Sequence, residues 1–300
     1  MAVRQPALTA SGADKALLLL LSAIWGGSFP LIRIAVGSLP PLWVVAGRIS
    51  LGDAALLAVL FLAGGRLPRG TGVWARLAFM GVFGNLAPFA LISWGEQEVA
   101  SGVAAILMAM VPLMVVLVAH FRVPDEPLTR AKWLGVVLGI AGTLVLIGPA
   151  ALHGLSGHVA GEIAILAATV CYAAATVAAR SLPALGSASV SAGVLLVAAP
   201  LGLAAAAISD PPGSLAPTIP ALAAVAVLGF LCTGLGYVLF FRILSRAGAG
   251  FASMNNYLVP PFGVIYGWIG LGERLSAAAL FAMMLILGGV LDQGWHRKPG

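Results

Sequence analysis

Long apolar runs alternate along the chain with short polar connections. A membrane-spanning helix needs about 20 mostly apolar residues, so each run predicts one transmembrane helix. The connections are rich in glycine and proline, as at Gly64–Pro68 and Asp210–Gly213, and none has room for a separate soluble domain. The pattern predicts ten spans, at residues 14–35, 40–63, 73–94, 97–120, 130–148, 158–180, 187–209, 217–243, 248–270 and 274–292.

Composition indicates that lipid surrounds this chain. Of its 300 residues, 61% are hydrophobic and only 9% are charged, whereas a soluble domain carries about 25% charged residues. We therefore predict an all-α integral membrane protein. The net charge of +6 does not indicate nucleic acid as a partner, because the basic residues flank apolar runs instead of gathering on one solvated face.

The positions of the basic residues predict how the chain is oriented. If ten spans start from a cytoplasmic N-terminus, thirteen of the sixteen Lys and Arg residues fall on the cytoplasmic side. Arg33 and Arg274 fall on the other side, and Arg48 lies within a span. Such an excess follows the positive-inside rule. We expect a multi-pass protein of the cell (inner) membrane with both termini in the cytoplasm.

The two halves of the sequence resemble each other at a constant offset. The segment Trp25–Arg33 lies 147 positions before Tyr172–Arg180, and both begin with an aromatic residue and end with arginine. Glu126–Thr129 lies 147 positions before Glu273–Ser276. An offset held across most of a half indicates an internal repeat rather than chance similarity.

The repeat predicts an inverted arrangement of the two halves. We assign one repeat to residues 1–150 and the other to residues 151–300, with five predicted spans in each. Because five is odd, the second repeat must enter the membrane from the opposite side. Inverted repeats give a transporter two related gates around a site near the middle of the bilayer. We therefore predict a secondary transporter that works by alternating access.

Several short motifs are spread over nearly the whole chain. They are Trp25-Gly-Gly-Ser-Phe, Ala100-Ser-Gly-Val-Ala-Ala, Val111-Pro-Leu, Glu126-Pro-Leu-Thr, Gly135-x-x-x-Gly139-x-x-Gly142, Val259-Pro-Pro and Gly272-Glu-Arg-Leu-Ser. In these motifs the chain resembles the EamA-type, ten-helix branch of the drug/metabolite transporter superfamily. The resemblance implies export of amino acids, other metabolites or toxic compounds.

The first span departs from the small four-helix relatives in that superfamily. Those relatives export cationic drugs and carry a membrane-embedded glutamate in their first span. Here the span has no acid between Asp14 and Arg33, so their proton-for-cation exchange is not expected from the resemblance.

We expect an exporter of small metabolites such as amino acids, acting around a central cavity. An exporter of toxic or drug-like amphipathic compounds and a non-transporting membrane scaffold are the alternatives. An enzyme is not expected, because the spans contain neither an aspartate dyad nor an HExxH motif. The expected partners are a small-molecule substrate and the bilayer, with a coupling proton or other ion left open. The histidines lack ligand spacing, and we expect no metal and no cofactor.

A polar stripe is predicted on the ninth span. Ser253, Asn256 and Tyr257 share one helical face, and the matching face of the fourth span, which includes Met108, is apolar. These polar side chains either line the cavity or join helices by hydrogen bonds. Both interpretations stay open from the sequence.

Two further spans carry polar and aromatic faces. Asn85 and Phe89 share a face of the third span, and Thr233 and Tyr237 share one of the eighth. Such faces suit a small amphipathic solute such as a neutral amino acid. Trp94, near the outer end of the third span, is either a gate or an interfacial anchor.

Two charges lie well inside the second span. An intramembrane charge is costly, which makes Arg48 and Asp53 functional candidates. They lie five positions apart, about 140° around an ideal helix, so they pair poorly with each other. Each has either a substrate or proton role or a structural partner within the bundle.

Two glutamates precede predicted helix N-termini. Glu126 comes before Thr129, and Glu273 comes before Ser276, where each hydroxyl is expected to cap a span. Acids near a helix N-terminus are favoured by the helix dipole, so we expect both glutamates to be structural.

Overall fold

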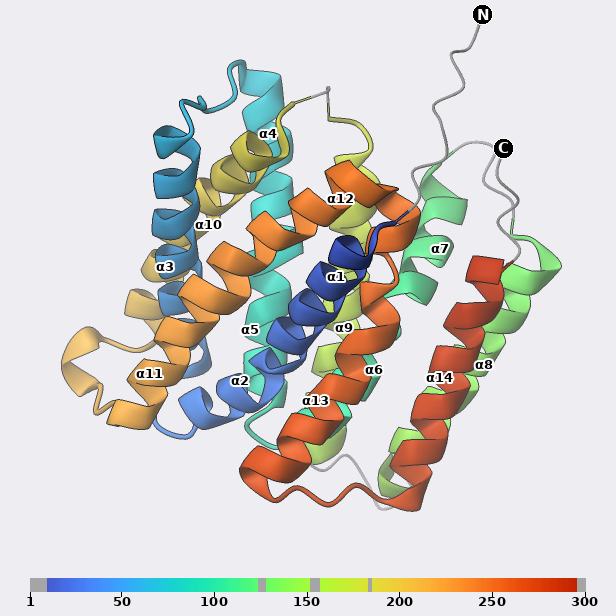
Figure 1. Cartoon of the computed structure of the whole chain (residues 1–300). Helices are drawn as coiled ribbons and strands as arrows, with labels where there is room; N and C mark the ends of the chain where they lie inside the picture. The colour runs from blue at the N-terminus through green and yellow to red at the C-terminus, as the bar shows by residue number, and fades with distance from the viewer. Residues whose placement is uncertain (1–9, 124–127, 152–156, 183–184, 296–300) are drawn as a thin grey trace, which may run out of the picture.

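The computed structural model describes residues 10–123, 128–151, 157–182 and 185–295. Within this part of the chain the helices follow one another as ten segments, one for each predicted span. Figure 1 shows them as a single bundle. The segments are α1 (Gly12–Gly26) with α2 (Ser28–Val36); α3 (Pro41–Leu62); α4 (Thr71–Gly81), η1 (Val82–Leu86) and α5 (Ala87–Gly95); α6 (Ser101–Met108) with α7 (Val111–Arg122); α8 (Arg130–Ala151); α9 (Gly157–Ala179); α10 (Ser187–Ser209); α11 (Ile219–Val227), η3 (Leu228–Leu235) and α12 (Gly236–Ala252); α13 (Asn255–Leu271); and α14 (Ala277–Trp295).

Apolar length supports the membrane assignment. Seven helical stretches of the described chain are long and apolar enough to cross a bilayer, and α8 and α14 contain shorter apolar stretches at 132–147 and 277–290. The prediction of an all-α membrane fold is confirmed.

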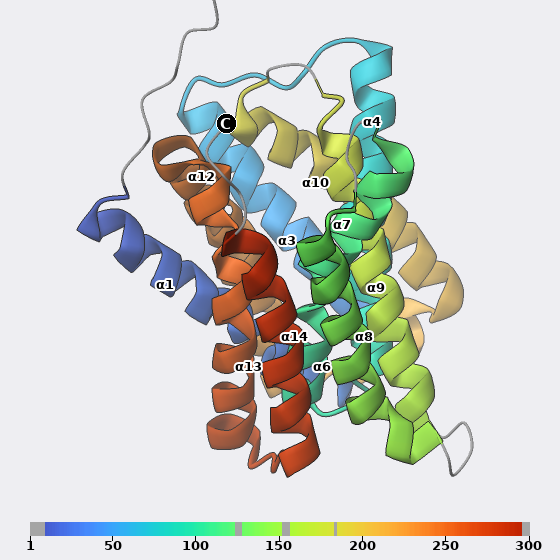
Figure 2. The same cartoon turned by 90° about the vertical axis from the view of Figure 1, so that its right-hand side faces the viewer.

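The main contacts between a helix of the first half and a helix of the second half have equivalent contacts in which the two halves trade places. α1 packs against α13 as α9 packs against α6, and α3 packs against η3 as α10 packs against α4. Equivalent helices also meet each other, as α8 meets α14 and α3 meets α10. α8 and α14 lie side by side and run in opposite directions (Figures 1 and 2). The chain therefore has the predicted two-repeat architecture.

A π-helical segment interrupts the equivalent helix of each half. The segment η1 begins at Val82, and η3 begins at Leu228. Wide turns of this kind are frequent at functional sites. Their paired occurrence indicates that both belong to the repeated architecture.

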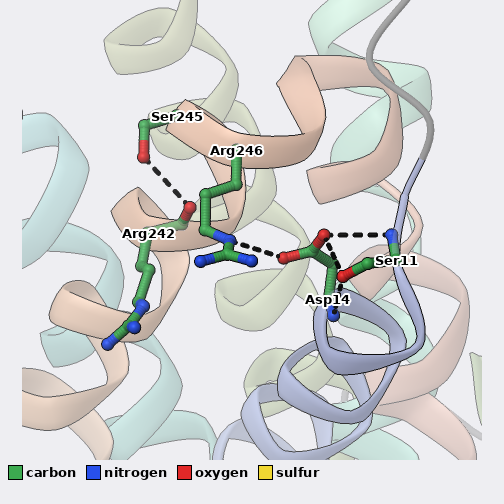
Figure 3. A network of polar contacts seen from close by, with 5 residues as sticks. All are labelled: Ser11, Asp14, Arg242, Ser245 and Arg246. Carbon is green, nitrogen blue, oxygen red and sulfur yellow. Dashed lines mark hydrogen bonds and ion pairs between the residues drawn. The ribbon is translucent and has the colours of Figure 1, made fainter.

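An ion pair joins the first helix to α12. Asp14 completes a capping box with Ser11 at the start of α1, and the Nε atom of Arg246 lies 2.8 Å from Asp14 Oδ1. Nearby, the Ser245 hydroxyl donates to the main-chain carbonyl of Arg242 (Figure 3). We call this side the terminal end, because α1 begins and α14 ends toward it (Figure 1).

At the far end, Glu273 joins the two halves. Its carboxylate accepts hydrogen bonds from the main-chain N–H groups of Ser101 (2.8 Å) and Gly102 (2.9 Å) and from the Ser101 hydroxyl (3.0 Å). Glu273 thus caps α6 of the other repeat rather than its own span, and Ser276 caps α14. Glu126 lies outside the described residues.

Candidate functional site

A buried arginine lies in the middle of the bundle. Arg48, on α3, is only 7% exposed. Its Nε donates to the Thr233 hydroxyl at 3.0 Å, and its guanidinium lies 3.8 Å from the centroid of the Phe89 ring. The Thr233 hydroxyl in turn donates to the carbonyl of Leu228 at 2.9 Å. These contacts fix both the hydroxyl and the guanidinium.

A second polar contact links η1 to α12. The Tyr237 hydroxyl donates to Asn85 Oδ1 at 2.6 Å, and Asn85 Nδ2 donates to the carbonyl of Met80 at 3.5 Å. The Tyr172 ring meets the Phe89 ring edge-on, with 6.5 Å between centroids. We call these side chains the central cluster: Arg48, Asn85, Phe89, Tyr172, Thr233 and Tyr237.

The electrostatics of the central cluster favour an anion. No carboxylate of the described residues lies within ion-pair distance of Arg48. Burying an unpaired charge is costly, and stacking on an aromatic ring offsets only about 0.5–2 kcal/mol of that cost. The guanidinium has five N–H donors in a planar fork that matches a carboxylate. The arrangement can therefore bind a carboxylate in a mostly apolar setting.

Cavities approach the bundle interior from both ends. A cavity of about 250 Å³ reaches Tyr237 and is lined near the terminal end by Arg242 and Ser245. A cavity of about 540 Å³ lies at the far end. The far-end cavity is lined by Arg33, Glu98, Val99, Ala100, Val103, His158, Glu162, Leu271 and Glu273.

The structure brings five predicted site residues together in the central cluster: Arg48, Asn85, Phe89, Thr233 and Tyr237. Met108 packs on the same apolar core as Tyr172. Asp53 is buried on α3, and its Oδ1 has no hydrogen-bond partner among the described residues. Trp94 is about half exposed near the end of α5.

The predicted stripe of the ninth span lies elsewhere. The Ser253 hydroxyl is exposed and donates to the carbonyl of Gly250. The Tyr257 hydroxyl donates to the carbonyl of Val290 on α14. Asn256 is half-buried on α13. The Ser253 and Tyr257 hydroxyls thus bond main-chain carbonyls of α12 and α14.

Sequence reasoning missed three interior residues. The signal for Tyr172 in the sequence is its position as the repeat mate of Trp25. The Asn255 side chain, rather than Asn256, is buried and accepts from the Ser22 hydroxyl at 2.8 Å. Glu96 is fully buried, although the spans predicted at 73–94 and 97–120 leave it in a connection. Nothing in the local sequence distinguishes it from exposed Glu98.

Comparison with known proteins agrees with this architecture. Residues 15–148 and 159–291 each match the EamA-like transporter family. A crystal structure with 24% sequence identity superposes with a TM-score of 0.66, covering 93% of this chain and 96% of the other, which supports the fold.

Named relatives match most of the length of the chain. An uncharacterized transporter of Bacillus subtilis, YoaV, is 25% identical over 90% of this chain and 92% of its own. A probable terminal-alkyne amino-acid exporter of Streptantibioticus cattleyicolor is 26% identical over 91% of both chains. An S-adenosylmethionine/S-adenosylhomocysteine transporter of Chlamydia trachomatis is 26% identical over 91% of this chain and 86% of its own.

Proposed function

Because the chain belongs to the EamA-like transporter family, we propose that it exports small carboxylate-bearing metabolites, with neutral amino acids as the substrate class. Transport proceeds by alternating access between the two cavities. The observation that carries this proposal is the buried Arg48 guanidinium, which is fixed by Thr233 and Phe89 and has no carboxylate partner among the described residues.

The central cluster supplies complementary contacts for such a substrate. The carboxylate binds the Arg48 guanidinium, and charge-assisted hydrogen bonds of this kind are about twice as strong as neutral ones. The Phe89 and Tyr172 rings form an apolar wall for the side chain of the substrate. The Tyr237 hydroxyl and the Asn85 amide supply polar contacts beside it.

Two relatives support this substrate class by the chemistry in their names. An amino acid and S-adenosylmethionine both carry an α-amino acid group, although their side chains differ in size and charge. A site that recognises the shared carboxylate fits both. We assign the terminal end to the cytoplasm from the distribution of basic residues, so the cavity that reaches Tyr237 serves as the cytoplasmic entrance.

A counterflow assay in proteoliposomes tests the proposal. Labelled leucine should exchange with internal leucine, and leucinamide, which lacks the carboxylate, should compete weakly. Arg48→Gln should reduce leucine exchange by about tenfold or more, because it removes a hydrogen-bonded charge. Arg69→Gln, the same change at an exposed arginine, is the control and should exchange leucine normally.

Two results would contradict the carboxylate site. One is leucinamide competing as strongly as leucine in the wild type, and the other is Arg48→Gln exchanging leucine like the control. A wild-type protein that exchanges amphipathic cations but no amino acid would favour a drug exporter. A protein that moves neither would be the scaffold.

A further inference from the structure

Glu96 is a fully buried carboxyl group without a hydrogen-bond partner. It follows α5 directly, at the far end of the third span, and is 0% exposed. Neither carboxylate oxygen has a hydrogen-bond partner among the described residues. A buried ionised carboxylate in that state is strongly disfavoured, so the protein retains a group that is costly unless it is neutral or meets a cation.

Close packing of two glycines explains the burial. A Cβ atom on Gly95 would lie 2.7 Å from the carbonyl of Gly161, and one on Gly161 would lie 2.9 Å from the carbonyl of Gly95. The backbones of α5 and α9 therefore touch at this point. The contact holds the residue after Gly95 inside the protein.

Charged groups on several elements lie near Glu96 without bonding its carboxyl. The Arg33 guanidinium on α2 donates to the main-chain carbonyl of Glu96. The Glu273 carboxylate is held by the N-terminus of α6. Arg48 approaches from α3, and α9 contributes His158 and Glu162 near the same end.

The surroundings favour the neutral form of the carboxyl. Burial raises the pKa of Glu96 well above its usual value of 4.5, and the negative charge of Glu273 adds to the rise. The positive charges of Arg33 and Arg48 oppose it. Glu96 therefore responds electrostatically both to the central arginine and to the lining of the far-end cavity.

Arg48 is a buried cation that has the Thr233 hydroxyl as a hydrogen-bond partner but no ion-pair partner among the described residues. Glu96 is a buried acid whose carboxyl oxygens have no hydrogen-bond partner there. A zwitterion carries both complementary charges. We propose that Glu96 is the anionic half of the substrate site, where it binds the α-ammonium group while Arg48 binds the carboxylate, and where a proton competes with that ammonium group.

The competition couples substrate transport to proton movement, and each cycle moves one net positive charge because the zwitterion itself is neutral. When the substrate binds, the protonated Glu96 gives its proton to water, and the carboxylate pairs with the ammonium group. When the substrate leaves, the carboxylate takes a proton from water in the far-end cavity. Each cycle exchanges one substrate for one proton moving the other way. This inference rests on the proposed function and specifies its substrate as a zwitterion.

Proton release distinguishes this role from a structural one. Adding leucine to purified protein in weakly buffered detergent should release protons, as measured with a pH dye. Isocaproate, which is leucine without its amino group, should release none. Its carboxylate neutralises the Arg48 guanidinium, whose positive charge otherwise favours the ionised form of Glu96. In proteoliposomes with an imposed pH gradient, leucine should accumulate in the acidic compartment.

Matched variants assign the effect to one carboxyl. Glu96→Gln should abolish the leucine-dependent proton release and reduce gradient-driven accumulation by about tenfold or more. Glu98→Gln, at the exposed glutamate two residues away, should behave like the wild type. Glu96→Asp retains a carboxyl group and should retain coupling, with its pH dependence moved to lower pH because aspartate is the stronger acid.

The outcomes separate the two proposals. Leucine-dependent proton release from Glu96→Gln, or equal release with leucine and isocaproate, would overturn the role of Glu96 while leaving leucine transport intact. If Glu96→Gln does not fold, a Glu96→Asp protein without coupling or with wild-type pH dependence overturns it. A wild-type protein that exchanges no leucine would overturn the proposed function, and this inference with it.

Discussion

Replacing Glu273 should weaken the contact between the two repeats at the far end. Its carboxylate accepts three hydrogen bonds, two of them from main-chain N–H groups in the first turn of α6. Those N–H groups have no partner within the helix. Glu273→Ala removes all three bonds, and Glu273→Gln keeps one acceptor oxygen but removes the negative charge.

The loss of stability depends on the strength of the lost hydrogen bonds and on whether water can bond the freed N–H groups. A hydrogen bond to a charged group contributes about 1.5–3 kcal/mol, and a neutral one about 0.5–1.5 kcal/mol. Because Glu273 lines the 540 Å³ cavity, water can reach the freed N–H groups and limits the loss. We expect Glu273→Ala to lower stability by about 2–4 kcal/mol and Glu273→Gln by about 1–2 kcal/mol.

Thermal unfolding in detergent, followed by intrinsic fluorescence at one scan rate, measures the effect. The expected loss corresponds to several degrees in Tm. Gly267→Ala offers an independent route to the same defect, because its Cβ would lie 2.5 Å from Glu273 Oε2. Glu98→Ala is the control, since its exposed side chain lines the same cavity. If Glu273→Ala unfolds at the temperature of this control, the cap does not stabilise the bundle.

Three further measurements test other parts of the structure. Folding raises the pKa of Glu96, so its contribution to stability is complete below the unfolded pKa near 4.5 and is lost as pH rises through the folded pKa. Tm of the wild type should therefore fall with rising pH relative to Tm of Glu96→Gln. Parallel plots of Tm against pH for the two proteins would contradict this. Asp14→Asn keeps the cap on α1 but loses the ion pair with Arg246, so Tm should decrease from wild type to Asp14→Asn to Asp14→Ala; equal Tm values for the wild type and Asp14→Asn would exclude a role for the ion pair. Cysteines at Gly70 and Ser214 should react with an impermeant thiol reagent from opposite sides of the membrane, and labelling from one side would refute the orientation.

Hydropathy predicted the helices well because bilayer thickness sets their length. The run predicted at 187–209 is α10 (Ser187–Ser209), and the start predicted at 130 is the start of α8. Helix interiors were less predictable. The helical wheel for the ninth span assumed one helix from residue 248, but a break at Ser253 and Met254 precedes α13, which begins at Asn255.

The candidate site was only partly predictable, for a physical reason. Asn85, Thr233 and Tyr237 stand out because a polar group within an apolar run needs a partner. Glu96 does not stand out, because its burial depends on the contact between Gly95 and Gly161, which are far apart in sequence. Single-sequence patterns carry no record of such a contact.

The repeat explains the position of the central cluster but not its chemistry. Asn85 and Thr233 lie in equivalent π-helical segments, and each side chain donates to the carbonyl five residues earlier, at Met80 and Leu228. The repeated backbone thus places a polar side chain on each side of the bundle interior. Arg48 breaks this symmetry, because the residue 147 positions later is Leu195, which is fully buried among apolar side chains. Two equivalent gates need a symmetric scaffold, whereas one substrate with a single carboxylate needs one cation. The asymmetry at Arg48 is therefore what the proposed site requires, and a substrate with two carboxylates would meet only one guanidinium there.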